Sequence, residues 1–203
     1  MKKILLLLLL CPLSLFAKFY NGSITLKDGS VKTGLVDVPR HSKSDKIQFK
    51  TDKKAKVQNL EIKTISAFSI TTDDGNILNY ITLKLSNPKT FSKEYTIDDE
   101  VSWVRVDHDS NLSIVVAFIA PALSYTPGEP VYYLHRKGDE HCSYITVFYA
   151  NSIQIGEFKT IKKTCEIIFK EDCPQLSEEL TKDLYKEKSL MAIVDLYNLF
   201  CAD

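Results

Sequence analysis

The chain is poor in the residues from which many catalytic and nucleic-acid-binding sites are built. Its 203 residues include seven glycines but no phosphate-binding glycine loop, Gly-x-Ser-x-Gly turn or His-Glu-x-x-His helix. Its arginines are Arg40, Arg105 and Arg136, so planar, bidentate clamps on phosphate or carboxylate groups have few candidates. Basic and acidic residues number 26 each. This balance gives no electrostatic reason to expect a nucleic acid or an anionic membrane surface as partner, and we predict no cofactor.

The rest of the composition is that of an ordinary globular protein. Apolar residues make up 44% of the chain and aromatic residues 10%, which excludes wholesale disorder and allows a sizeable core. The length suits one domain, or one domain with a small appendage.

Residues 1–17 have the pattern of a secretory signal peptide. Lys2 and Lys3 precede an unbroken apolar run, Ile4 to Leu10, and a less regular stretch ends at Ala17. A helix over residues 4–17 would span roughly 21 Å, short of the ~30 Å hydrocarbon core of a bilayer. We therefore predict cleavage after Ala17 and export to the periplasm or cell surface. No second apolar run of membrane-spanning length follows, so the mature chain is predicted to contain no transmembrane helix.

Cys11 provides an alternative address. A bacterial lipoprotein is cut just before a cysteine and acylated on it, which would anchor this chain in the outer membrane as part of an envelope complex. The preceding Leu8-Leu9-Leu10 lacks the small residue expected there, and Pro12 follows directly. We favour the cleaved leader.

Four cysteines remain beyond the leader: Cys142, Cys165, Cys173 and Cys201. An even number in an exported chain predicts two disulfides, although four cysteines allow three connectivities. We favour Cys173–Cys201, which would close a helical hairpin, and Cys142–Cys165, which would tie the last strand region to the first C-terminal helix. The absence of a Cys-x-x-Cys pair disfavours a zinc site or thioredoxin-like chemistry, and we predict no metal site.

Residues 18–156 are predicted to form an antiparallel β domain, either a sandwich or a barrel-like sheet. Polar and apolar residues alternate in residues 23–26 and 31–38 around an Asp28-Gly29 turn, which predicts a hairpin. Residues 103–106 and 112–119 predict a second hairpin, and residues 77–85, 131–135 and 144–149 further strands. Residues 43–56 are rich in lysine around Ile47-Gln48-Phe49, which we interpret as an edge strand flanked by a solvated loop. The turns recur every 8–12 residues, as in sandwiches and barrels.

From residue 157 the apolar period becomes that of helices that pack on the sheet, so the predicted class is α+β. Apolar residues recur every three or four positions from Phe158 to Phe169, and Asp172-Cys173-Pro174 ends this helix. Leu176, Leu180 and Leu184 predict a second helix. Ser189 is a candidate N-cap for a third.

Four groups of residues could carry chemistry, and each has a simpler structural interpretation. Asp98-Asp99-Glu100 and Asp107-His108-Asp109 are acidic, but neither fits a calcium loop and both are typical of solvated turns. His135, His141 and Cys142 lie close in sequence, and we interpret residues 137–141 as a polar loop between strands. The fourth group is a set of aromatic residues that could line a ligand groove, although strand aromatics are more often core. Its members are Tyr125, Tyr132, Tyr133, Tyr144, Phe148 and Tyr149.

The two ends of the chain resemble a family of uncharacterised exported proteins of Bacteroidota. The opening resembles the family's strand–turn–strand module, from Gly22-Ser23-Ile24 through Asp28-Gly29-Ser30 to Gly34-Leu35-Val36. Ser30 stands where the family usually has threonine. The ending is similar in Asp172-Cys173-Pro174, Ser189-Leu190 and Tyr197-Asn198 with Cys201. The resemblance implies a cell-envelope location and supports the Cys173–Cys201 pair, but it brings no known activity.

These patterns favour an exported protein that acts as a non-enzymatic binding or structural module, with an envelope protein or a small ligand as partner. A hydrolase-like enzyme is the alternative, with a His/carboxylate site near residues 98–109 or 135–141. The third possibility is the lipoprotein acylated on Cys11.

Overall fold

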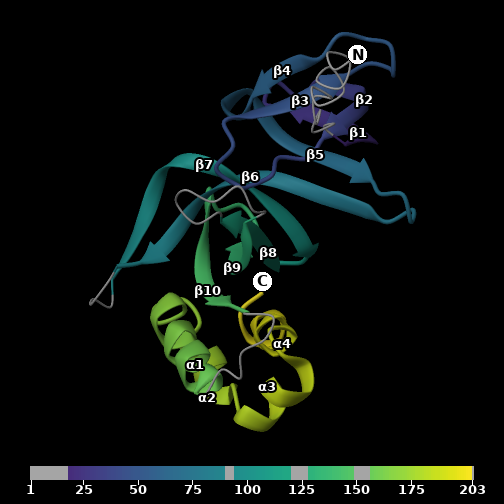
Figure 1. Ribbon diagram of the computed structural model, residues 1–203. Coiled ribbons are helices and arrows are strands. Elements are labelled where there is room, and N and C mark those ends of the chain that lie inside the picture. Colours follow the sequence, from purple (N-terminus) through teal and green to yellow (C-terminus); the bar gives the residue numbers. More distant parts are fainter. Residues whose placement is uncertain (1–17, 90–93, 120–127, 149–155, 203) are drawn as a thin grey trace, which may run out of the picture.

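The computed structural model describes residues 18–89, 94–119, 128–148 and 156–202. A β region is followed by short helices, which confirms the predicted α+β class (Figure 1). The strands are β1 (Phe19–Leu26), β2 (Val31–Asp37), β3 (Lys46–Lys50), β4 (Gln58–Glu61), β5 (Ile65–Thr71), β6 (Ile77–Pro88), β7 (Tyr95–His108), β8 (Leu112–Ile119), β9 (Glu129–Arg136) and β10 (His141–Val147). The helices are the 3₁₀ turn η1 (Ile62–Thr64), α1 (Glu157–Ile168), α2 (Pro174–Glu179), α3 (Lys182–Lys188) and α4 (Met191–Phe200).

Strands β6 to β10 form a closed barrel. Each strand pairs antiparallel with the next, and β10 then pairs parallel with β6 through His141–Lys84, Cys142–Leu85 and Ser143–Ser86. The interior is filled by side chains from all five strands, which we call the barrel core. Its buried members are Leu83, Leu85, Val104, Val115, Ala117, Val131, Tyr133 and Cys142. The predicted barrel-like sheet is therefore confirmed in its closed form.

The long strands β6 and β7 belong to two cores at once because side chains alternate along a strand. Leu83 and Val104 point into the barrel core, whereas Tyr80 and Trp103 point away from it. Those two aromatic residues join a second cluster, which we call the N-terminal core. Its other buried members are Ile24, Val36, Ile47, Phe49, Ile65, Phe68 and Ile70.

The N-terminal sheet continues from β6 in the order β5, β1, β2, β3, β4. The predicted hairpin of β1 and β2 is confirmed, and its turn places Gly29 at a φ of 85°, where glycine meets no steric penalty. The backbone N–H of Ser30 donates to the Asp28 carboxylate at 2.8 Å. The prediction that the segment around Ile47 is an edge strand is wrong, because the four residues of β4 pair with β3 and form the edge themselves.

Ser42 separates β7 from β8 at one end of their ladder. Its N–H donates to the Phe118 carbonyl, its carbonyl accepts from the Trp103 N–H, and its hydroxyl accepts from the Phe118 N–H, at 2.8 to 2.9 Å. The register of the two strands would otherwise place Trp103 opposite Phe118. The Trp103 indole N–H also donates to the Ser44 carbonyl at 2.9 Å. The loop after β2 is thereby fixed in the ladder between the two strands.

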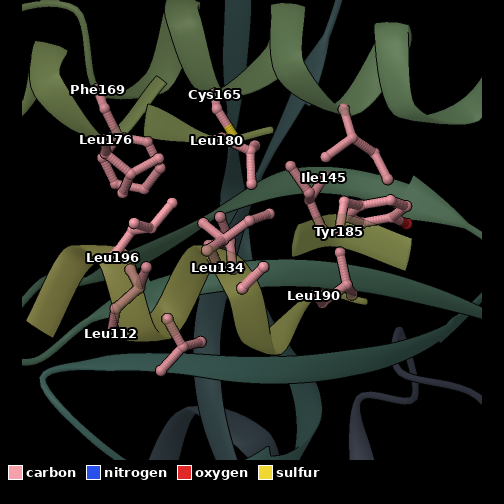
Figure 2. Close-up of a cluster of buried hydrophobic side chains, with 14 of the residues drawn as sticks. Leu112, Leu134, Ile145, Cys165, Phe169, Leu176, Leu180, Tyr185, Leu190 and Leu196 are labelled. Carbon is pink, nitrogen blue, oxygen red and sulfur yellow. The ribbon is translucent and has the colours of Figure 1, made fainter. Parts of the chain in front are cut away.

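The helices cover the outer face of β8, β9 and β10. Figure 2 shows Leu112, Leu134 and Ile145 from these strands against residues of the helices. We call this cluster the helical core; its fully buried helical members include Cys165, Phe169, Leu176, Leu180 and Ile193. In the described part of the chain, no helix is both long and apolar enough to cross a membrane.

The helix boundaries differ from the predicted ones at two points. The single helix predicted over Leu176, Leu180 and Leu184 is two helices, because Thr181 is extended and its hydroxyl caps α3 by accepting from the Leu184 N–H at 3.2 Å. Ser189 does not cap α4. It ends α3 with a φ of 53°, and Leu190 takes the N-cap position.

Candidate functional site

The predicted Cys173–Cys201 disulfide is present. It joins the start of α2 to the end of α4, with the two Cα atoms 5.8 Å apart, a typical separation for a disulfide. Arg136, the last residue of β9, lies beside it. Its guanidinium donates to the Ile168 carbonyl at 3.0 Å, pairs with Asp172 at 2.6 Å and lies over the Phe169 ring. The end of α1 is thus attached to the barrel next to the cross-link.

The predicted Cys142–Cys165 disulfide is wrong, because both thiols are free and buried. Cys142 points into the barrel core and lies near the Lys84 carbonyl, whereas Cys165 belongs to the helical core on the outer face of the sheet. The strand therefore separates the two sulfur atoms. Burial raises the pKa of Cys142 and raises that of Cys165 to about 12, so neither thiol is a ready nucleophile.

The acidic run Asp98-Asp99-Glu100 does not form the predicted turn but lies within β7. The Asp98 carboxylate pairs with Lys43 at 3.2 Å, and the run lines a shallow hollow of about 320 Å³. Nowhere in residues 18–89, 94–119, 128–148 and 156–202 do three or more His, Cys, Asp or Glu side chains gather so that they could hold a metal ion.

In the second acidic group, Asp107 and His108 are the last residues of β7, and only Asp109 lies in the turn before β8, so the turn predicted from Asp107 begins two residues later. Both carboxylate oxygens of Asp107 accept from the Arg105 guanidinium, at 2.5 and 2.9 Å. The Asp109 carboxylate accepts from the Ser113 hydroxyl at 3.3 Å. Each carboxylate therefore has a structural partner within its own hairpin.

His135 and His141 flank the polar turn predicted between β9 and β10. The Nε2 atom of His135 lies 3.0 Å from the Asp139 carbonyl, a contact that closes the turn. His141 begins β10 and pairs with Lys84 across the barrel closure. These contacts are those of a hairpin, and the predicted loop is confirmed over residues 137–140.

The aromatic group separates into core and surface members. Tyr133 is buried in the barrel core, where its hydroxyl donates to the Asn87 side chain at 2.8 Å. Tyr132 and Phe148 pack edge to face beside the helical core, with ring centres 4.9 Å apart. Tyr144 alone of the described members lines a groove. Tyr125 and Tyr149 lie outside the described residues, as does Cys11.

That groove lies between the barrel and α1, and we call it the barrel–helix groove. It has a volume of about 390 Å³, within the size range of small-molecule sites. Its walls are the ends of β6 and β7, strand β10 and one face of α1, represented by Pro88, Tyr95, Tyr144 and Ile167. Lys159, Thr160, Lys163 and Thr164 of α1 complete the lining.

Tyr95 joins the two walls of the groove. Its hydroxyl lies 3.4 Å from the Tyr144 carbonyl and also hydrogen-bonds with the Thr164 side chain. Burial raises the pKa of Tyr95, so its phenol stays protonated at neutral pH. The Tyr144 ring lies edge to face with Tyr133, at 6.0 Å between ring centres. The tyrosine wall is therefore held by contacts that do not involve a ligand.

Sequence reasoning found only Tyr144 of this groove. Pro88 and Tyr95 are about 50 positions from Tyr144 along the chain, and no motif links them to α1. The signal that could have been used is Lys159 and Lys163, one turn apart on the exposed face of an amphipathic helix.

No family model, curated protein or solved structure matches the chain.

Proposed function

We propose that this protein is exported to the cell envelope and works there as a non-enzymatic binding module, with the barrel–helix groove as its binding surface. The observation that carries the binding role is the groove itself, a hollow of ligand size that is lined by two tyrosines of the barrel and two lysines of α1. The predicted leader at residues 1–17 and the Cys173–Cys201 disulfide support the address, because such bonds persist in oxidising compartments. The resemblance of both chain ends to exported Bacteroidota proteins points the same way.

Export is tested by expressing the full chain in a bacterial host and sequencing the N-terminus of the protein in each cell fraction. We expect the periplasmic fraction to contain a chain that begins at Lys18. A chain that begins at Met1 in the cytosol would contradict the proposed address. A chain that begins at an acylated Cys11 would replace it with the lipoprotein, and a Cys11→Ser variant identifies that outcome by the loss of acylation.

Binding is tested on the mature, oxidised protein labelled with nitrogen-15. Addition of soluble components extracted from the envelope of its source organism should shift the amide resonances of Tyr95, Tyr144 and Lys163, while those of Lys182 and Lys186 on α3 stay in place. Mass spectrometry should return the extracted components unchanged. Conversion of a component by the protein would overturn the non-enzymatic role, and shifts confined to other surfaces would overturn the assignment of the groove.

A further inference from the structure

We propose that the barrel–helix groove binds a carboxylate carried on a ring, either a carboxylated sugar or an aromatic acid. This inference rests on the proposed binding function and adds the chemical class of the ligand. The two halves of such a ligand correspond to the two walls of the groove: the lysines of α1 match its charge, and the tyrosines of the barrel match its flat face.

The charged wall consists of Lys159 and Lys163. They are four positions apart on α1, which places their Cβ atoms about 5–6 Å from each other on one helix face. Both residues are exposed, and neither ammonium group has an ion-pair partner among the described residues. Like charges at this spacing destabilise a helix slightly. A carboxylate between the two ammonium groups would remove that repulsion and gain two charge-assisted hydrogen bonds.

A comparison with a second helical lysine pair of the same spacing shows how the surroundings of the two pairs differ. Lys182 and Lys186 on α3 are also four positions apart, but Lys186 lies 3.6 Å from the Asp183 carboxylate. Lys162, on the neighbouring face of α1, donates to the Leu180 carbonyl at 3.2 Å. Lys182 and Lys186 line a separate hollow of about 380 Å³ that also contains Glu157, whereas no carboxylate is among the residues that line the groove with Lys159 and Lys163.

The flat wall consists of Tyr95 and Tyr144, with Pro88 and Ile167 as apolar neighbours. Both tyrosines are half-buried, and their contacts with Thr164 and Tyr133 hold them in place. Aromatic rings fixed in this way offer a planar apolar surface at little entropic cost on binding. A ligand with a ring can lie on this surface while its carboxylate reaches the lysines, whereas a simple inorganic anion would use only one of the walls.

The test is isothermal titration calorimetry on the mature, oxidised protein with two probes, the trimer of galacturonic acid and 4-hydroxybenzoate. We expect at least one probe to bind with a dissociation constant on the order of 0.1–1 mM. The neutral counterparts, galactose trimer and 4-hydroxybenzyl alcohol, should bind at least about tenfold more weakly. The probe that binds identifies the ring as sugar or aromatic.

Variants locate the binding site. The double variant Lys159→Gln/Lys163→Gln should weaken binding at least about tenfold, and Tyr95→Leu should weaken it by a similar factor. The matched control Lys182→Gln/Lys186→Gln, a lysine pair of equal spacing on α3, should bind within about twofold of the parent protein. Circular dichroism verifies that each variant is folded.

Three results would overturn the inference: no binding of either acid, equal binding of the neutral counterparts, or equal affinity in the two lysine double variants. Binding of polyphosphate or an acidic peptide in place of both ring acids would also overturn it. These failures are distinct from failure of the proposed function. If envelope components shift the groove resonances but neither ring acid binds, the binding role stands and only this ligand class is excluded.

Discussion

The barrel is covered on two sides, and the two covers are attached to it by different means (Figure 1). The N-terminal sheet shares β6 and β7 with the barrel, so backbone hydrogen bonds run from one core into the other without a break. The helices share no strand with the barrel. Their attachment depends on the side chains of the helical core and on Arg136, and the Cys173–Cys201 disulfide ties the helices to one another.

The two covers also differ in composition and charge. The N-terminal core contains the aromatic residues Phe49, Phe68, Tyr80 and Trp103, whereas the helical core consists mainly of aliphatic side chains. Residues 18–76 carry 11 basic and 7 acidic residues, against 7 basic and 10 acidic in the helical residues 157–203. Because of how each is attached, a cover built from continuing strands should unfold together with the barrel, whereas a cover of packed helices can open by itself.

Trp103→Ala should have the largest effect, because it removes a buried aromatic side chain where the N-terminal core meets β7. We expect the free energy of unfolding to fall by about 3–5 kcal/mol, measured by urea denaturation followed by circular dichroism. The transition should remain single. A separate early transition of the N-terminal sheet would show that the shared strands do not couple the two cores. Ile97→Ala, at an exposed position of the same strand, is the control and should change stability by less than about 0.5 kcal/mol.

Cys201→Ser should have the next largest effect. The disulfide closes a loop of 28 residues in sequence, so its loss should lower the free energy of unfolding by about 3–4 kcal/mol in the chain-entropy model. Hydrogen exchange should show the amides of α4 losing protection before those of β1 and β2. The parent protein treated with reductant is the matched control and should behave like the variant. Equal loss of protection in α4 and β1 would remove the distinction between the two covers.

Ser42→Ala should lower the free energy of unfolding by a smaller amount. Ser42 lies where the loop after β2 of the N-terminal sheet enters the barrel ladder. The change removes the hydroxyl that accepts from the Phe118 N–H, and leaves that partly buried donor without its partner. We expect a loss of about 1–3 kcal/mol in the free energy of unfolding from urea titration. Ser44→Ala is the matched control, because the Ser44 hydroxyl is exposed and its one side-chain contact, with His41, is 3.4 Å long. Equal effects of the two changes would contradict the role assigned to Ser42.

Thiol reactivity tests the positions of Cys142 and Cys165, and it requires no change in stability. In a mature chain that begins at Lys18, two thiols should react with Ellman's reagent after denaturation without reductant, and four after reduction. In the native protein at pH 8 both should react slowly, because burial raises their pKa values. Single variants Cys142→Ala and Cys165→Ala separate the two sites. Cys165, which lies under the helices, should react faster than Cys142, which lies inside the barrel. If the denatured protein had no reactive thiol before reduction, the second disulfide would be present after all.

Local sequence patterns predicted much of the fold. The Asp28-Gly29 turn between alternating strands located the β1–β2 hairpin, and the change of period at residue 157 located α1. The Asp172-Cys173-Pro174 break located the end of that helix and one half of the disulfide. These features depend on residues a few positions apart, so the chain itself carries the information.

The errors at the second disulfide, the acidic run and the groove share one physical cause, which is that they concern long-range pairing. The Cys142–Cys165 pair failed because the alternation of β10 sends Cys142 into the barrel and leaves the helices on the opposite face. The acidic run at Asp98 was predicted as a turn because its three carboxylates suggest solvent, yet β7 continues through it by pairing with the far end of β6. The groove escaped prediction because Tyr95, Tyr144 and Lys163 meet only when β10 closes on β6.

The α+β class, the main hairpins and the helical ending could be predicted from the sequence, because turns, strand alternation and the apolar period of a helix act over a few residues. Three features depend on contacts between distant residues: the closure of the barrel, the entry of Ser42 into the ladder between β7 and β8, and the two free thiols on opposite sides of β10. The same closure places the tyrosines of the barrel beside the lysines of α1. Strand order and closure depend on the free energy of burying whole faces, which no short stretch of residues contains.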